Sequence, residues 1–76
     1  MVDRNFLIKL VQARMPYGRF ETRYITELPV SYLEWMNRQG FPSGELGQFL
    51  ATMHVIKTNG LESILSPIVS QYRNRG

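Results

Sequence analysis

The sequence predicts a small α+β fold that is mainly α. We expect a bundle of about four helices, with a short two-stranded β excursion between the first and second helices. Apolar residues recur at helical spacing in most of the chain. Proline, glycine and asparagine separate the helical segments. The segment after the first helix is instead rich in aromatic and β-branched residues, which favour strands.

The length and composition predict one globular domain over residues 1–76, with residues 73–76 as a frayed tail. Hydrophobic residues make up 43% and charged residues 20%, as in ordinary globular chains. The chain has no cysteine, which excludes a disulfide framework, a thiolate metal site and a cysteine nucleophile. No apolar run approaches the roughly 18 residues of a membrane span, and no signal peptide is visible. We therefore expect a soluble, cytoplasmic protein without membrane contact.

The first helix is predicted over residues 3–13, with Asp3 as its N-cap. Its apolar face combines Phe6, Leu7, Leu10 and Val11, broadened by Ile8. Pro16 stops it. The irregular segment 15–28 follows, in which we expect two very short strands that turn near Glu21 and Thr22. Gly18 permits a backbone conformation that other residues avoid.

The next helix is predicted over residues 30–39. Pro29 suits a helix start. Ser31 and Glu34 fit a capping box, which would place the start two residues later, so both starts remain open. Gly40 is the expected terminator. The apolar face comprises Tyr32, Leu33, Trp35 and Met36. We assign these residues to the core, with a protein-binding surface as the alternative for Trp35, Tyr32 and Met36.

The following helix is predicted over residues 44–59, with Ser43 as its cap. Its core stripe contains Leu46, Phe49, Leu50, Met53 and Ile56. Gly47 inside this helix costs about 1 kcal/mol relative to alanine, so we expect a close contact with another helix or an aromatic ring there.

The last segment spans residues 61–72 and crosses Pro67. Its apolar stripe consists of Leu61, Ile64, Leu65, Ile68 and Tyr72. Proline inside a helix removes a hydrogen bond and clashes with the preceding turn. The helix is therefore either kinked at Pro67 or broken there, with Ser66 capping the restart.

Residues able to carry catalysis are few. His54 is the single histidine and is predicted to be an ordinary helix-surface residue. The six acidic residues are scattered: Asp3, Glu21, Glu27, Glu34, Glu45 and Glu62. No phosphate-binding loop is present. We expect no metal, no cofactor and no standalone enzyme.

Cations are concentrated at the two ends of the chain. Residues 1–25 hold five cations and two anions, residues 26–72 hold two cations and four anions, and Arg73 and Arg75 follow. In the first third, arginines alternate with aromatic residues. Cations position phosphate backbones and aromatic rings stack on bases. The stronger interpretation is that a protein this small needs these rings in its core and that the arginines form an ordinary solvated face. The candidate contact residues for nucleic acid or a partner are Arg14, Tyr17, Arg19 and Arg23.

A linked series of motifs supports a family resemblance. It begins with Met15-Pro16-Tyr17-Gly18-Arg19-Phe20, followed by Glu27-Leu28-Pro29 and by Tyr32-Leu33-x-Trp35. It continues through Gly40-Phe41-Pro42-x-Gly44-Glu45-Leu46-Gly47 and Ile56-Lys57-x-Asn59-Gly60-Leu61-Glu62. Over about residues 7–67 the chain resembles a small bacterial family labelled “putative quorum-sensing-regulated virulence factor”, whose biochemical role is unknown.

Residues 15–35 are also similar to the C-terminal module of exonuclease-X-like DNA exonucleases, where the module accompanies a separate catalytic domain. The chain departs from the family pattern at Glu21-Thr22, where Lys-Gly is usual. That change puts in doubt a role for the turn as a basic, phosphate-contacting loop.

Two functional hypotheses follow. The first is a non-catalytic cytoplasmic binding or adaptor domain, whose partner is another protein or a second copy of itself; the family label links it to virulence regulation. The second is a nucleic-acid-binding accessory module that uses the arginines and aromatic rings near residues 14–23.

Overall fold

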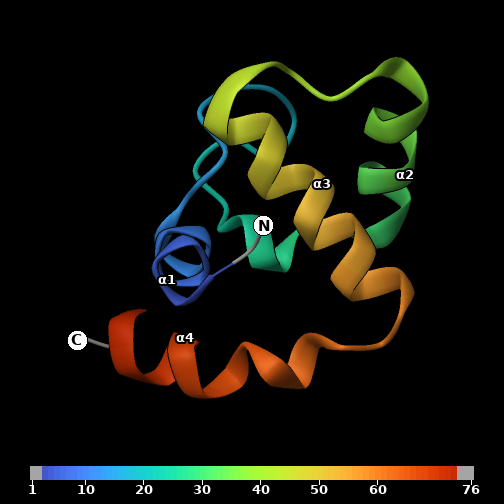
Figure 1. Cartoon of the computed structure of the whole chain (residues 1–76). Helices are drawn as coiled ribbons and strands as arrows, with labels where there is room; N and C mark the ends of the chain where they lie inside the picture. Colours follow the sequence, from blue (N-terminus) through green and yellow to red (C-terminus); the bar gives the residue numbers. More distant parts are fainter. Residues whose placement is uncertain (1–2, 74–76) are drawn as a thin grey trace.

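The computed structural model describes residues 3–73 and contains four α-helices and two single 3-10 turns. In chain order these are α1 (Arg4–Gln12), η1 (Ile25–Glu27), α2 (Val30–Gln39), α3 (Gly44–Thr58), η2 (Glu62–Ile64) and α4 (Ser66–Arg73). α1 packs against α4 and α2 packs against α3, while η1 contacts both α1 and α3 (Figure 1). The predicted helical bundle is therefore confirmed.

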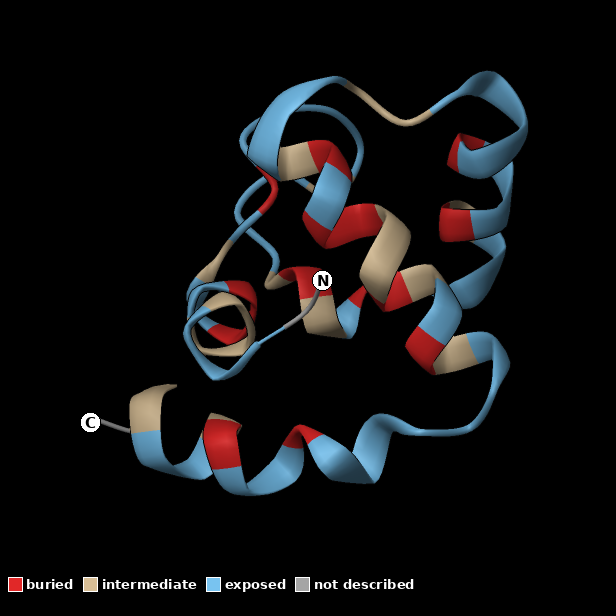
Figure 2. Ribbon diagram, in the orientation of Figure 1, coloured by how far each residue is buried: buried red, intermediate tan, exposed pale blue. Residues whose placement is uncertain are grey.

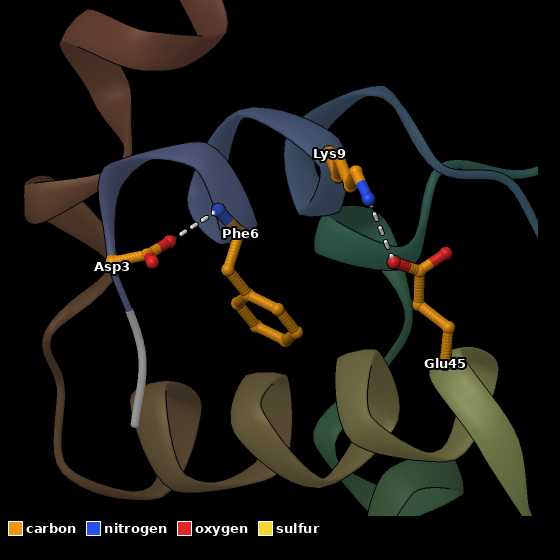
Figure 3. A network of polar contacts seen from close by, with 4 residues as sticks. All are labelled: Asp3, Phe6, Lys9 and Glu45. Carbon is orange, nitrogen blue, oxygen red and sulfur yellow. Dashed lines mark hydrogen bonds and ion pairs between the residues drawn. The ribbon is translucent and has the colours of Figure 1, made fainter.

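The α1 helix begins as predicted at its capping residue. The Asp3 carboxylate accepts a hydrogen bond of 2.9 Å from the Phe6 backbone N–H (Figure 3). One turn later, Lys9 Nζ lies 3.3 Å from Glu45 Oε2 and ties α1 to the start of α3. On the inner face Leu10 and Val11 are fully buried. The N-terminal sequence thus sets both the first residue and the buried side of α1.

The core lies where α3 passes between the other helices (Figure 2). Its buried apolar side chains are Leu10, Val11, Met15, Ile25, Leu28, Leu33, Met36, Phe49, Leu50, Met53, Ile56, Leu65 and Ile68. The ring of Phe6 packs on that of Phe49, with centroids 5.2 Å apart. Leu46 is only partly buried, and the other four residues of the predicted α3 stripe are buried.

Gly47 makes the close approach that its place in a helix suggested, although its neighbour is neither a helix nor an aromatic ring. A Cβ at this position would lie 2.9 Å from the carbonyl carbon of Pro42 and closer still to its oxygen. The turn before α3 therefore rests directly on the α3 backbone, and glycine is what permits this.

The predicted two-stranded β excursion is wrong. Among residues 3–73 the only pairing outside the helices is a single antiparallel bridge between Arg14 and Tyr24. The ladder cannot extend because α1 ends two residues before Arg14, and Pro16 on the other side has no N–H to donate. A 3-10 turn then begins directly after Tyr24.

The start of α2 is settled in favour of Pro29. Pro29 is the N-cap, and Ser31 lies inside the first turn, so the predicted capping box at Ser31 and Glu34 is wrong. Ser43 does occupy the N-cap of α3, but its side chain makes no capping hydrogen bond. Gly40 follows α2 with φ of 94°, a conformation that suits glycine.

The last helical segment breaks before Pro67. The η2 turn ends at Ile64, and α4 starts at Ser66, which is its first helical residue and not its cap. The break changes which residues face inward: Leu65 and Ile68 are buried, whereas Leu61 and Ile64 are exposed. Arg73 belongs to α4 and is not frayed; the rest of the predicted tail, residues 74–76, lies outside the described residues.

Candidate functional site

A tied loop supplies one wall of a hollow on the surface. Met15 donates its N–H to the Arg23 carbonyl at 2.9 Å and accepts from the Thr22 N–H at 2.8 Å. The residues between these bonds bulge outward as a compact loop, and Gly18 within it has φ of 86°. A Cβ on Gly18 would lie 3.7 Å from the Tyr32 hydroxyl, so the loop comes close to α2.

The α2 helix supplies the opposite wall. The Phe20 ring meets the Tyr32 ring edge-on at 4.7 Å, and this contact joins the loop to the helix. Tyr32 in turn stacks on Trp35, with centroids 6.1 Å apart and planes inclined by 20°. The resulting groove has a volume of about 790 Å³. We call this hollow the aromatic groove. Its lining residues are Tyr17, Gly18, Arg19, Phe20, Pro29, Ser31, Tyr32, Trp35, Met36, Gln39, Gly40 and Pro42.

Two large aromatic side chains of this groove are half exposed: Tyr17 at 50% and Trp35 at 49%. The expectation that Trp35 is a core residue is therefore wrong. Leu33 and Met36 are the buried positions of α2. At about 100° per residue, Trp35 is turned roughly 200° from Leu33 and 100° from Met36, so it faces outward. Trp35 therefore lies at the surface of the molecule, half exposed to water.

The charge at the groove comes from Arg19. It is the one charged residue among those of the described chain that line the aromatic groove, and it is exposed. Its guanidinium lies 5.6 Å from the centre of the Phe20 ring, within the range of a cation–π contact. Within residues 3–73 no acidic side chain pairs with it. The groove is thus apolar and aromatic with one free cation at its edge.

The four predicted contact residues do not form one site. Tyr17 and Arg19 line the aromatic groove together. Arg14 instead donates to the Tyr24 hydroxyl at 2.9 Å and to the Thr22 carbonyl at 3.1 Å, with its guanidinium 4.2 Å from the Tyr24 ring centre. Arg23 is exposed and does not line the groove. Arg14 is therefore occupied in holding the base of the loop.

A second guanidinium, from the end of α4, packs on the Tyr24 ring. Arg73 lies 3.8 Å from the Tyr24 ring centre and donates to the Thr26 hydroxyl at 3.0 Å. These contacts tie the end of α4 to η1. A shallower hollow of about 380 Å³ is lined here by Tyr24, Glu27, Val69, Ser70 and Arg73. The cluster explains why Tyr24 is structural, in contrast to the exposed Tyr17.

Sequence reasoning missed the α2 side of the groove. It found Tyr17 and Arg19 from the alternation of basic and aromatic residues, but it assigned Tyr32 and Trp35 to the core. The signal that was available is the spacing of Leu33 and Met36, which already accounts for the buried face of a helix of 10 residues. Gly40 and Pro42 reach the groove only through the turn after α2, which no local pattern predicts.

The described residues contain no candidate metal centre. No group of three or more His, Cys, Asp or Glu side chains within residues 3–73 is arranged to hold a metal ion. His54 is partly buried, and its ring lies 6.2 Å from that of Phe41. No helix within residues 3–73 is both long enough and apolar enough to cross a membrane.

Comparison with known proteins extends over most of the chain. The sequence model of the family described as “Putative quorum-sensing-regulated virulence factor” matches residues 3–68, a range that includes every residue of the aromatic groove. “Uncharacterized protein YpeB” from Escherichia coli strain K12 is 34% identical over 68 residues, which cover 88% of this chain and 94% of that protein. The protein of the same name from Escherichia coli O157:H7 matches equally well. No solved structure gives a significant match.

Proposed function

This chain belongs to the family described as “Putative quorum-sensing-regulated virulence factor”, and we propose that it is a non-catalytic cytoplasmic binding domain that docks a partner protein in the aromatic groove. The observation that carries the proposal is the pair of half-exposed rings, Tyr17 and Trp35, on the two walls of one hollow. Tyrosine and tryptophan dominate the binding energy of protein interfaces.

The groove is supported from behind in a way that suits a binding surface. Tyr32 stacks on Trp35 and meets Phe20, so both walls rest on fixed rings. Met36 at the floor is buried and belongs to the core. A surface whose side chains are already ordered loses less conformational entropy when a partner binds. A small domain that keeps two large rings half in water forgoes the stabilisation that their full burial would give, and this favours a role for them in recognition.

The test is a selection of displayed random peptides on the wild-type protein, with a counter-selection on Trp35→Ala. We expect enriched peptides that bind the wild type and lose at least tenfold in affinity on Trp35→Ala and Tyr17→Ala. Val55→Ala is the matched control, because Val55 is 54% exposed but lies outside the groove. Enrichment that the groove variants leave unchanged, or no enrichment at all, would contradict the proposal. A partner that is a second copy would show as concentration-dependent dimerisation abolished by Trp35→Ala.

A second candidate function is nucleic-acid binding at the same surface. Arg19 beside the exposed Tyr17 ring favours it, since a cation and a stacking platform are what single strands require. The sequence pattern of residues 15–35, which suggested a resemblance to the exonuclease-associated module, is a second reason to consider it. Titration of labelled single- and double-stranded DNA and RNA at two salt concentrations tests this candidate. We expect binding that weakens steeply with salt and is lost in Arg19→Glu/Arg23→Glu; unchanged affinity of that double variant would remove the site.

A further inference from the structure

We propose that the occupant of the aromatic groove is an extended, proline-rich peptide segment that carries an acidic residue beside Arg19. This inference rests on the proposed function and specifies its ligand. Three properties of the groove lead to it: the hydrogen-bonding groups that its rings leave free, the flat faces that those rings expose, and the sign of its single charge.

The rings of the groove carry hydrogen-bonding groups that the fold does not use. Within residues 3–73, no hydrogen bond engages the Tyr17 or Tyr32 hydroxyl or the Trp35 indole N–H. The hydroxyl of Tyr24, in contrast, accepts from Arg14. A polyproline II segment has no internal hydrogen bonds, so all its carbonyl oxygens are available to such donors.

The exposed ring faces match the shape of proline. Proline-rich segments are recognised by grooves between aromatic side chains, where the pyrrolidine rings pack flat on the aromatic faces. Tyr17 and Trp35 provide such faces on opposite walls of the groove, and the Tyr32–Trp35 stack holds one of them in place. A segment that is already extended before binding loses little conformational entropy. This matters here because the groove of one small domain provides few contacts to offset such a loss.

The other common ways of binding a peptide fit less well. Strand addition needs a sheet edge, and the described residues contain no strand. A helix satisfies most of its own backbone groups, so its backbone offers few acceptors to the donors of Tyr17, Tyr32 and Trp35, and any donor that its side chains do not reach is left unpaired. Each buried unpaired donor costs about 1–3 kcal/mol. The geometry therefore favours a ligand whose backbone carbonyls are free.

The charge at the groove selects among ligands. Arg19 is exposed, lines the groove and has no acidic partner in the described chain, so an acidic side chain at the edge of the peptide complements it. A nucleic-acid strand needs a series of cations along its backbone. Here Arg14 and Arg73 are turned toward Tyr24 instead. One cation suits one carboxylate better than a run of phosphates.

The test is a titration with defined probes. The main probe is an acetylated, amidated and fluorescein-labelled peptide of consecutive prolines followed by two aspartates. The matched probes are the same peptide with lysines in place of the aspartates, the same peptide with alanines in place of the prolines, an amphipathic leucine-rich helical peptide, and an oligo-dT strand. Anisotropy measures affinity. With unlabelled peptide, the emission of Trp35, the one tryptophan of the chain, reports contact at the groove.

We expect the proline–aspartate peptide to saturate the protein and to shift the Trp35 emission to the blue. The lysine version should bind at least fivefold more weakly, and the alanine version at least tenfold more weakly. Trp35→Ala and Tyr17→Ala should each lose at least tenfold, and Arg19→Glu should reverse the preference for aspartate over lysine. Arg4→Glu and Val55→Ala are the matched controls outside the groove, and circular dichroism verifies that every variant is folded.

The contrary outcomes are distinct. Preferential binding of the helical peptide, sensitive to Trp35→Ala, would overturn the ligand class and leave the proposed function intact. Salt-sensitive binding of oligo-dT without peptide binding would overturn both and support the nucleic-acid candidate. If none of these probes binds, the inference is wrong, and the display selection described above then decides on the proposed function separately.

Discussion

At the scale of single residues, Thr22 is the clearest departure from what its side chain prefers. Its φ is 71°, in the left-handed region, and it is the one non-glycine residue with positive φ within residues 3–73. β-Branched side chains are especially disfavoured there. The tight return of the loop to Met15, through a hydrogen bond of 2.8 Å from the Thr22 N–H, requires this conformation.

Replacing Thr22 with glycine should therefore stabilise the protein. The left-handed conformation costs a non-glycine residue about 1–2 kcal/mol. The greater freedom of glycine in the unfolded chain offsets about 0.5–1 kcal/mol of this gain. We expect Thr22→Gly to raise the free energy of unfolding by about 0.5–1 kcal/mol, measured by urea denaturation.

Glu21→Gly is the matched control, because Glu21 is the neighbouring exposed residue and its φ is not positive. It should lower the free energy of unfolding by a similar amount, since it gains only unfolded-state freedom. Equal destabilisation by both substitutions would show that Thr22 is not strained.

Residue-scale predictions from sequence succeeded where the cause is local. Asp3 caps α1 because a carboxylate three residues before the Phe6 amide needs no tertiary partner. Gly47 was identified as a close-packing position from its cost in a helix, although its neighbour, the Pro42 carbonyl, is set by the path of a turn. Trp35 was assigned wrongly because its apolar character alone says nothing of the direction in which the helix turns it.

At the scale of elements, helices were predictable and the β excursion was not. Three of the four α-helices lie within the predicted segments, and α4 ends one residue beyond its own. Apolar periodicity and the residues that bound each segment act over short range, so sequence alone can locate the helices. Strand formation depends on a partner. Between residues 13 and 28, α1 and Pro16 leave room for one paired position, so residues with strand preference form a loop and a 3-10 turn instead. The tied loop of the groove could not be derived from propensity for the same reason.

The α4 helix allows a decisive test of why the last segment breaks. Pro67 is the second residue of α4, where a backbone N–H has no partner in the helix. We expect Pro67→Ala to lower the free energy of unfolding by about 0.4–1 kcal/mol, because it frees the unfolded chain without adding a native hydrogen bond. The measurement is chemical denaturation together with the helical signal at 222 nm.

A continuous last helix would give the opposite result. If Pro67 were all that interrupts a helix from η2 to α4, its removal would increase both the helical signal and the stability. Ser70→Ala, on the exposed side of α4, serves as the control for a change of side chain without a change of backbone freedom. Ser70→Ala should change the free energy of unfolding by less than about 0.5 kcal/mol and leave the helical signal at 222 nm unchanged.

At the scale of the whole molecule, stability comes from the apolar core around α3, and surface ion pairs contribute little. A domain of 76 residues has a free energy of unfolding of about 4–11 kcal/mol. Leu50 is fully buried, and its replacement by alanine should cost about 3–5 kcal/mol. Glu45→Gln, which removes an ion pair whose side chains are 64% and 55% exposed, should cost less than about 0.5 kcal/mol. Urea denaturation measures both.

If the two variants lost similar amounts of free energy of unfolding, the Lys9–Glu45 ion pair between α1 and α3 would stabilise the fold far more than its exposure suggests. Leu50→Ala should also raise hydrogen exchange throughout the described chain, because α3 contacts both α2 and η1. Glu45→Gln should leave exchange unchanged beyond the first turn of α3.

The loop that Met15 closes on itself bears on how fast the proposed ligand would be captured. Its two backbone bonds, and the edge-on meeting of Phe20 with Tyr32, hold the walls of the aromatic groove at a set separation before anything enters. Capture then involves no opening step. The observed association rate should therefore rise linearly with ligand concentration, without a plateau, because diffusion limits it. Differences between ligands will accordingly appear in how long each one stays.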